Sequence, residues 1–295
     1  MRVLVLGATG MLGQALMTEA KRRGICATGV ARSGADVSID IADSRQLKKV
    51  IEQLRPEVII NTIALTNIET CEKEPCLAYL INARSVNVMA EYARENGAYL
   101  IQISTDHYYT NDCDSRHAET SPVRLINEYT RTKFAGENFA LTCPGALVVR
   151  TNIVGFRHKH KKDQPTFAEW VIQTLKNGLP ITLFDDFFTS SIHVAQLSTA
   201  LFDILDKHPC GILNLASRDV FNKKVFIEAI ASCLGYSLSY ARTGSVLESA
   251  DVPRAESLGL DVTKAEKILG YRLPTMLEVV DSLISEYKET FCDEV

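Results

Sequence analysis

In the first half of the chain, short apolar segments alternate with longer segments in which apolar residues recur every three or four positions. The segment RVLVLG, residues 2–7, holds a continuous apolar run, as expected of a strand buried on both faces. In residues 11–24, Leu12, Leu16 and Ala20 have helical spacing and Gly24 follows the last of them. The pattern predicts a strand followed by an amphipathic helix.

The same alternation continues to about residue 151. It predicts further strands at residues 26–31, 57–62, 98–105 and 146–151, and helices at residues 43–56, 75–96 and 128–141. Repeated strand–helix–strand units require parallel pairing, because each connecting helix returns the chain to the same end of the sheet. We therefore predict an α/β fold with a doubly wound parallel sheet.

Beyond residue 151 the alternation is less regular. Helices are predicted at residues 166–178, 194–208, 223–235 and 275–289, and strands at residues 180–186 and 211–217. We expect residues 1–150 to form the doubly wound domain, to which the chain returns at about residues 190–215. Residues 151–189 and 216–295 are expected to form a smaller C-terminal lobe over the carboxyl ends of the strands, where such sheets bind ligands.

Three glycines follow the first predicted strand and open the first predicted helix, in the segment GATGMLG. In a dinucleotide site, Gly7 would permit the tight turn, Gly10 would let the backbone approach a pyrophosphate, and Gly13 would allow close packing of the helix. A plain glycine-rich turn is the alternative, but the flanking strand and helix favour the ligand site. Residues 1–150 are therefore predicted to be an NAD(P)-binding Rossmann domain.

The end of the second strand bears on the choice of cofactor. An acidic residue there would bind a ribose 2′-hydroxyl, whereas an arginine would accommodate a 2′-phosphate. The segment VARSG contains Arg32 and no acid, which favours NADP(H) over NAD(H). Asp40 and Ile41 lie a little further along and could contact the adenine.

Tyr129 and Lys133 lie one helical turn apart in the segment EYTRTK, and a surface pair is the ordinary explanation of that spacing. Reduction of a ketone would supply a functional explanation of the same spacing, because the carbonyl oxygen must be polarised and must receive a proton. Tyrosine has a pKa of about 10, and we expect the nearby Lys133 ammonium and a cationic nicotinamide to lower it. Ser104 or Thr105, at the end of the preceding strand, would orient the carbonyl.

This constellation resembles the extended short-chain dehydrogenase/reductase superfamily, and within it the dTDP-4-dehydrorhamnose reductases and related sugar-nucleotide reductases. The resemblance rests on segments that fall in order along nearly the whole chain: GATGMLG, SIDIAD, VIINTIALTNIETCEKEP, LINARSVNVMAEYA, ISTDHYY, NEYTRTKFAGE, VVRTNIVG and PRAESLGLDVTKAEKILGYRLP.

The resemblance implies an NAD(P)H-dependent reductase of a 4-keto-6-deoxy sugar linked to a nucleoside diphosphate, with Tyr129 as proton donor. The implied catalytic residues are Thr105, Tyr129 and Lys133. The implied cofactor residues, with those predicted above, are Gly7, Gly10, Met11, Leu12, Gly13, Arg32, Asp40, Ile41, Ala64, Leu65, Thr66, Tyr129 and Lys133.

On the substrate side the chain departs from these relatives. It reads STDHYYTN where they usually read STDYVFDG, and Ile153 in RTNI replaces the tryptophan of RTSW, which helps to seat the substrate. The basic run RHKHKK, residues 157–162, is either a solvated loop or a contact for a substrate anion. Candidate substrate-binding residues are Thr105, Asp106, His107, Asn152, Ile153, Arg157 and Arg254.

Two alternative functions remain open. The related proteins include the beta subunit of methionine adenosyltransferase, so the chain could be a non-catalytic, NAD(P)-binding regulatory subunit. It could also be a nucleotide-sugar epimerase or dehydratase, although such enzymes usually need an acid or base besides the tyrosine, and only Asp106 adjoins Thr105.

Composition narrows the range of partners. A net charge of −4 and a pI of about 5.9 argue against a nucleic-acid-binding protein. No signal peptide and no apolar run near the ~20 residues of a membrane helix is visible.

Eight scattered cysteines without a C-x-x-C pair suggest reduced thiols in the cytoplasm. His158 and His160 could contact a metal, but without a suitably spaced carboxylate we expect none. The resemblance makes a homodimer possible.

Overall fold

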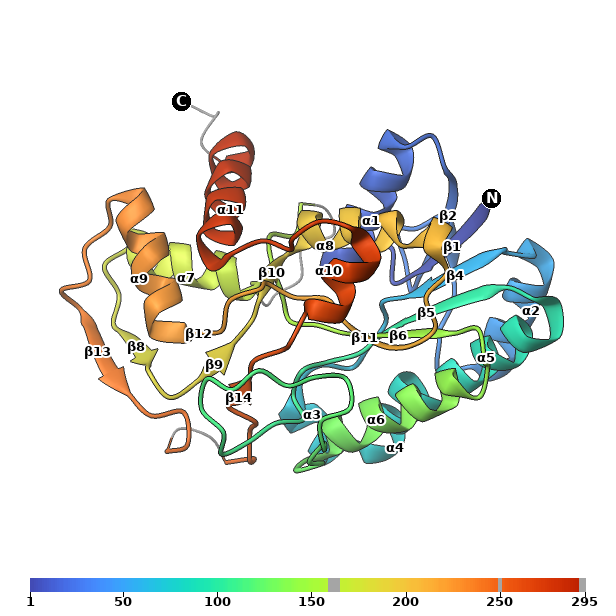
Figure 1. The fold of residues 1–295 in the computed structure, drawn as a ribbon, viewed down its shortest axis with the longest axis horizontal. Coiled ribbons are helices and arrows are strands. Elements are labelled where there is room, and N and C mark those ends of the chain that lie inside the picture. Colours follow the sequence, from blue (N-terminus) through green and yellow to red (C-terminus); the bar gives the residue numbers. More distant parts are fainter. Residues whose placement is uncertain (159–164, 249–250, 292–295) are drawn as a thin grey trace.

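The structure is a computed structural model that describes residues 1–158, 165–248 and 251–291. Within these ranges the central sheet has seven strands, all parallel, in the order β11-β6-β5-β4-β1-β2-β3 (Figure 1). They are β1 (Arg2–Leu6), β2 (Cys26–Ala31), β3 (Val37–Ser38), β4 (Val58–Asn61), β5 (Tyr99–Ile103), β6 (Leu147–Arg150) and β11 (Gly211–Asn214). The strand order changes direction between β1 and β4. The predicted doubly wound parallel sheet is confirmed.

Helices cover both faces of this sheet (Figure 1). One face carries α1 (Met11–Arg22) and α8 (Val194–Asp203), and the other carries α2 (Ser44–Leu54), α5 (Ser85–Asn96) and α6 (Glu128–Leu141). Strand β1 divides its side chains between the two layers, because successive residues of a strand point to opposite faces. Val3 and Val5 are buried in the α1 layer, whereas Leu4 and Leu6 are buried in the α2 layer. Burial of each such side chain stabilises the fold by roughly 1.5–3 kcal/mol.

The helix predicted at residues 75–96 contains an irregular turn. The segment consists of α4 (Pro75–Tyr79), a π-helical turn (Leu80–Arg84) and α5. At this turn α6 comes so close that a Cβ atom on Gly136 would lie 2.2 Å from the carbonyl oxygen of Asn82. The Asn82 side chain accepts a hydrogen bond from the Leu65 amide (2.8 Å) and donates one to the Leu65 carbonyl (3.1 Å). The turn therefore fixes the loop that follows β4.

A second group of elements has a hydrophobic core of its own, on the left of Figure 1. We call it the C-terminal lobe; its helices are α7 (Phe167–Lys176), α9 (Lys223–Leu234) and α11 (Met276–Phe291). Its strands pair as β8 (Ile181–Phe184) with β13 (Ala241–Gly244), and as β12 (Phe221–Asn222), β9 (Phe188–Thr189) and β14 (Ser257–Leu258). The pair β7 (Ile153–Val154) and β10 (Ile192–His193) connects it with α8.

Three short helices complete the described chain: α3 (Ile68–Lys73), α10 (Thr263–Leu269) and a 3-10 turn (Leu205–Lys207). The return of the chain to the sheet is made by α8, which packs on α1, and by β11, which pairs with β6. Helix α10 also contacts β11, and its Ala265 and Leu269 belong to the core of the α1 layer. The division into two domains at the residues given above stays a prediction.

Candidate functional site

The glycine turn between β1 and α1 is held by close backbone contacts. Gly7 has a φ of +88°, which favours glycine, and a Cβ atom on Gly13 would lie 2.0 Å from the Gly7 carbonyl oxygen. Helix α1 begins after Gly10, which has no side chain to cap the first-turn amides. Uncapped amides at a helix N-terminus suit an anion such as a diphosphate. The turn therefore fits the predicted dinucleotide.

Predicted cofactor residues lie after β1, β2 and β4. Met11 and Leu12 form the first turn of α1, and Arg32 is exposed directly after β2. Ala64 and Leu65 are half-buried and Thr66 is exposed in the loop after β4. These segments meet at one edge of the sheet, because the carboxyl ends of parallel strands lie together.

Next to β3 and α2, Ile41 is buried and the Asp40 carboxylate accepts a hydrogen bond from the Ala42 amide at 3.0 Å. Sequence reasoning missed Asp36 in the same region. Its carboxylate accepts a hydrogen bond from the Gly29 amide at 2.7 Å, so an acid does lie near the end of β2. Only the fold reveals that contact, since Asp36 stands five residues beyond Ala31, the last residue of the strand.

Thr105, Tyr129 and Lys133 are brought together after the carboxyl end of β5. The start of α6 is fixed by Asn127, whose side chain accepts a hydrogen bond from the Thr130 amide at 2.9 Å. Thr105 lies close enough to Tyr129 to lower the pKa of its hydroxyl, and the Lys133 ammonium group donates to the Ile103 carbonyl at 2.8 Å. All three side chains are buried, and Tyr129 is 7% exposed. The three side chains lie at the edge of the sheet that also holds the glycine turn. Reduction of a ketone by a dinucleotide needs such an arrangement.

We expected Lys133 to lower the pKa of Tyr129, and for the protein without a cofactor this prediction is wrong. Burial raises the pKa of Tyr129 above its usual value, which outweighs the lowering by the hydrogen bond from Thr105. Burial also lowers the pKa of Lys133 to about 8, against the opposing effect of Glu137. Tyr129 thus keeps its proton at neutral pH, which is the form that a proton donor requires.

A buried ion pair supports these residues from behind. Glu137, one turn beyond Lys133 on α6, binds Arg150 at the end of β6 through contacts of 2.7 and 3.0 Å. The Glu137 carboxylate also accepts a hydrogen bond from Ser104 at 2.6 Å, and Arg150 donates to the Tyr109 hydroxyl at 3.1 Å. The network ties α6 to β5 and β6 and so fixes their relative positions beneath the candidate site.

Asp106 and His107 face the C-terminal lobe. The Asp106 Oδ2 atom accepts a hydrogen bond from Asn152 at 2.9 Å, whereas its Oδ1 atom is buried without a hydrogen bond among the described residues and lies 3.8 Å from Nε2 of His107. Burial raises the pKa of Asp106 to about 7. The His107 ring meets the Tyr129 ring edge-on, with centroids 5.7 Å apart. Burial, followed by the charges of Lys223 and Arg254, lowers the pKa of His107 to about 4, so this ring is neutral at pH 7.

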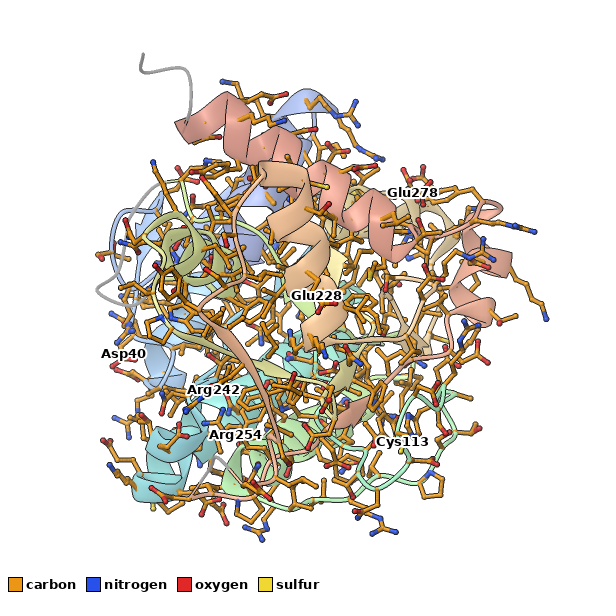
Figure 2. The ribbon with its side chains drawn as sticks, turned by 90° about the vertical axis from the view of Figure 1, so that its left-hand side faces the viewer. Asp40, Cys113, Glu228, Arg242, Arg254 and Glu278 are labelled. Carbon is orange, nitrogen blue, oxygen red and sulfur yellow. The ribbon has the colours of Figure 1, made fainter. Side chains whose placement is uncertain are left out.

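The predicted substrate-side arginines differ in their surroundings. Arg254 forms an ion pair with Glu69 of α3, and Figure 2 shows it beside the blue-green N-terminal part of the chain. Arg157 donates its backbone N–H to Glu169 at 2.9 Å, and Ile153 is half-buried in β7. Residues 159–162 of the basic run lie outside the described residues.

His158 and His193 share one carboxylate. Each donates its Nε2–H to Glu286 of α11 at 2.5 Å, His158 to Oε1 and His193 to Oε2. His160 lies outside the described residues. Within residues 1–158, 165–248 and 251–291, no group of three histidine, cysteine, aspartate or glutamate side chains has the geometry of a metal site.

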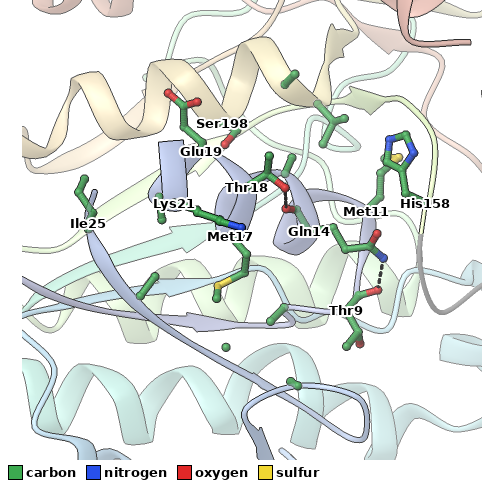
Figure 3. Close-up of a pocket in the computed structure, with 18 of the residues that line it drawn as sticks. Thr9, Met11, Gln14, Met17, Thr18, Glu19, Lys21, Ile25, His158 and Ser198 are labelled. Carbon is green, nitrogen blue, oxygen red and sulfur yellow. Dashed lines mark hydrogen bonds between the residues drawn. The ribbon is translucent and has the colours of Figure 1, made fainter. Parts of the chain in front are cut away.

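A large cavity lies along α1 (Figure 3), and Tyr129 is not among the residues that line it. Its volume is about 1090 Å³, and its lining includes Thr9, Gln14, Met17, Ser198 and His158. In Figure 3 the Gln14 amide donates to the Thr9 carbonyl, at 2.8 Å, beside the start of α1. The cavity thus reaches the dinucleotide turn from the side of α8, and the sequence offered no indication of it.

Two further findings concern the described part of the chain. None of its helices is long and apolar enough to cross a membrane. Its seven cysteines are free thiols: Cys26, Cys71, Cys76, Cys113, Cys143, Cys210 and Cys233. Two of them, Cys71 and Cys143, are buried.

Comparison with known proteins gives a consistent result. The family model described as "RmlD substrate binding domain" matches residues 1–289. The probable low-salt glycan biosynthesis reductase Agl14 of Haloferax volcanii is 26% identical over 299 residues, which cover 97% of this chain and 99% of the relative. Methionine adenosyltransferase 2 subunit beta of Xenopus tropicalis is 26% identical over 291 residues, or 96% of this chain and 87% of the relative.

A solved structure extends the similarity to three dimensions. The crystal structure of dTDP-4-dehydrorhamnose reductase from Bacillus anthracis, in complex with NADP, superposes with a TM-score of 0.86. Its sequence is 25% identical, and the match covers 97% of this chain and 99% of that one.

The fold, the site and these similarities define an oxidoreductase of the extended short-chain dehydrogenase/reductase type. More narrowly, the chain belongs to the RmlD substrate binding domain family, because the family model matches almost its whole length.

Proposed function

We propose that this protein reduces a 4-keto-6-deoxy sugar linked to a nucleoside diphosphate, using NADPH, with Tyr129 as the proton donor. The observation that carries the proposal is the grouping of Thr105, Tyr129 and Lys133 after β5, next to the glycine turn. The reductases to which the chain is similar support the reaction class.

Each of the three residues has a task that follows from its contacts. Thr105 lies close enough to Tyr129 to lower the pKa of its hydroxyl, so the Thr105 hydroxyl would orient the same carbonyl oxygen that Tyr129 protonates. Tyr129 transfers its phenolic proton to that oxygen as the oxygen gains negative charge. Lys133 stabilises the phenolate that remains, since its ammonium is held within the same cluster by the Ile103 carbonyl.

The dinucleotide would be held by the uncapped amides at the start of α1 and by the loop around Leu65. When bound, the reduced nicotinamide supplies the hydride. Arg32, exposed after β2, favours a 2′-phosphate and hence NADPH. Asp36 lies on the same loop, where its Oδ2 atom accepts a hydrogen bond from the Gly29 amide, so the preference for NADPH rests on Arg32 alone.

Substrate entry requires a movement of the protein. Thr105 and Asp106 are 3% and 0% exposed, and the ring of His107 covers the edge of Tyr129. Lys223, at the start of α9 of the C-terminal lobe, lies close enough for its charge to lower the pKa of His107. We infer that the lobe moves away from the sheet to admit the sugar and closes again to exclude water.

The test is NADPH oxidation with a panel of nucleotide-linked 4-keto-6-deoxy sugars, comparing the wild-type protein with Tyr129→Phe. Loss of the proton donor is expected to lower kcat by about 100-fold or more, while NADPH binding, measured by fluorescence, stays unchanged. Equal activity in the two proteins would remove Tyr129 from the mechanism. No turnover by the wild-type protein with any member of the panel would overturn the proposed function.

A non-catalytic regulatory subunit is the second candidate. It is favoured by the similarity to methionine adenosyltransferase 2 subunit beta and by the nearly closed site around Tyr129. This candidate predicts NADPH binding without oxidation for the whole panel.

The epimerase or dehydratase alternative would use Asp106 as its additional acid, since burial keeps the pKa of that carboxyl near 7. It predicts an altered sugar without net consumption of NADPH.

A further inference from the structure

Asn127 precedes α6, the helix that carries Tyr129 and Lys133, and its side chain makes two hydrogen bonds of different kinds. Its Oδ1 atom accepts from the Thr130 amide at 2.9 Å and so caps the helix. Its Nδ2 atom donates to the Pro253 carbonyl, also at 2.9 Å. The residue is 1% exposed, so both bonds are shielded from water. One buried side chain therefore joins the start of α6 to a residue 126 positions further along the chain.

The helix cap alone does not explain an asparagine at this position. Serine and aspartate cap helices about as well as asparagine does. The Thr130 amide can only donate a hydrogen bond, whereas the Pro253 carbonyl can only accept one. The carboxamide of Asn127 supplies one acceptor and one donor and so satisfies both groups. The second bond indicates a role for Asn127 beyond the start of the helix.

Pro253 belongs to a segment of the chain, residues 252–258, that lies beside the candidate site. Val252 packs against the small hydrophobic cluster that contains Tyr129. Arg254 forms an ion pair with α3. The segment ends in β14, which pairs with β9 of the C-terminal lobe. The hydrogen bond to α6 thus lies between two other contacts that hold this part of the lobe next to the proton donor.

The same segment is bound to the loop that follows Thr105. The Ser257 hydroxyl accepts a hydrogen bond from the Asp112 amide at 2.9 Å, and the Ser257 amide donates to the Tyr109 carbonyl at 3.3 Å. Residues 252–258 therefore connect the C-terminal lobe with both elements that supply the candidate catalytic residues. A movement of the lobe away from the sheet acts on these contacts first.

We propose that Asn127 is a positioning residue: its Nδ2 atom holds residues 252–258 beside Tyr129, while its Oδ1 atom fixes the helix that carries Tyr129. This inference rests on the proposed function, in which the C-terminal lobe opens to admit the sugar. The bond to Pro253 forms only when the segment lies against α6, so its free energy favours the closed protein. A larger closed fraction raises the apparent affinity for a substrate that is held in the closed form. Asn127 thus lowers KM without contacting the substrate.

The experiment compares the wild-type protein with Asn127→Ser, Asn127→Asp and Asn127→Ala at pH 8. Serine keeps a cap acceptor, but its side chain is one bond shorter and does not span the distance to Pro253. Aspartate keeps the shape and the cap, but it places a second acceptor opposite the Pro253 carbonyl. Alanine loses both bonds. Asn222→Ser is the matched control, because Asn222 caps α9 in the same way, through the Val225 amide at 2.9 Å.

Asn127→Ser and Asn127→Asp are each expected to raise KM for the keto sugar by about 2- to 10-fold, the range for one hydrogen bond, with kcat nearly unchanged. NADPH affinity, measured by fluorescence, stays at the wild-type value. Asn127→Ala raises KM and also lowers kcat and the thermal unfolding midpoint, because the first turn of α6 loses its cap. Asn222→Ser leaves KM and kcat unchanged.

Hydrogen–deuterium exchange followed by mass spectrometry tests the tether without any substrate. In Asn127→Ser and Asn127→Asp, the amides of residues 252–258 are expected to exchange faster than in the wild-type protein, because the segment opens more often. The amides of α6 keep their protection in these two variants, since the cap remains. In Asn222→Ser neither segment changes.

Wild-type KM in both Asn127→Ser and Asn127→Asp would overturn the inference and leave the proposed function standing, since either residue replaces a mere cap. Unchanged exchange in residues 252–258 would overturn it too. If neither variant folds, the bond is needed for folding rather than for closure, which also contradicts the inference. A wild-type protein that reduces no keto sugar would remove the proposed function and this inference with it.

Discussion

Replacing Glu137 by glutamine tests whether the buried ion pair beneath the site holds α6 against the sheet. Glu137 and Arg150 have side chains that are 1% and 2% exposed. The carboxylate accepts two hydrogen bonds from the guanidinium group, at 2.7 and 3.0 Å, and one from Ser104, at 2.6 Å. In Glu137→Gln an amide N–H₂ group replaces one oxygen and meets a donor of Arg150.

The expected loss of stability is large because the guanidinium charge stays buried while its counter-charge is gone. Removing one partner of a buried pair costs about 3–5 kcal/mol, which raises the unfolding constant roughly 100-fold to several thousand-fold. Glu52→Gln is the control. Glu52 contacts Lys48 at 3.9 Å, and both side chains are more than half exposed, so that variant is expected to stay within about 1 kcal/mol of wild type.

Urea unfolding, followed by far-UV circular dichroism and by tryptophan fluorescence, measures the difference. Trp170 is the single tryptophan and lies on α7 of the C-terminal lobe, whereas circular dichroism reports on the whole chain. Coincident transitions justify a single free energy of unfolding. A separate fluorescence transition would show that the lobe unfolds independently of the sheet, and the stability loss is then read from the dichroism transition.

The double variant Glu137→Met with Arg150→Met separates the charge from the packing. Removing both charges is expected to restore much of the stability that Glu137→Gln loses, since no ion then remains buried without a partner. If Glu137→Gln unfolds at the same urea concentration as Glu52→Gln, the ion pair does not stabilise this fold in the way described. If the double variant is less stable than the single one, the loss comes from packing.

Two further predictions concern the glycine turn and the titration of a buried acid. Gly13→Ala places a Cβ atom 2.0 Å from the Gly7 carbonyl, so it should weaken NADPH binding by at least about 10-fold, whereas Gly145→Ala, with open space around it, should leave calorimetric binding unchanged. Burial raises the pKa of Asp106 from 3.8 to about 7, so the folded state retains a proton that the unfolded chain loses above about pH 4. Stability should therefore fall between about pH 4 and 7 in the wild-type protein, and thermal unfolding of Asp106→Asn should lack that component; parallel curves for the two proteins would contradict the assignment.

Part of the site could be predicted because it depends on local spacing. The three glycines of residues 7–13 and the pair Tyr129 and Lys133 lie within one turn or one helix, so their geometry follows from secondary structure alone. Thr105 was placed correctly at the end of its strand for the same reason. The parallel sheet followed from apolar runs that alternate with helical periodicity.

The rest depends on contacts between distant segments. The direction of the Tyr129 pKa shift was mispredicted, because burial by neighbours such as Cys71 and Ala78 outweighs the lowering by Thr105. Asp36 was overlooked because only the fold brings its carboxylate to Gly29. Nothing in the chain distinguishes Lys223 from Lys224 until α9 is packed against Phe167 and Phe187.

The sequence by itself therefore determined the main strands and helices of the parallel sheet, the doubly wound class and the glycine turn, since each is encoded by residues close together along the chain. Only the tertiary structure decided which charges share an enclosed space. Glu137 of α6 meets Arg150 of β6 although 13 residues separate them in the sequence. Protonation and ligand contacts follow from burial and from distance in space, and neither quantity is contained in spacing along the sequence.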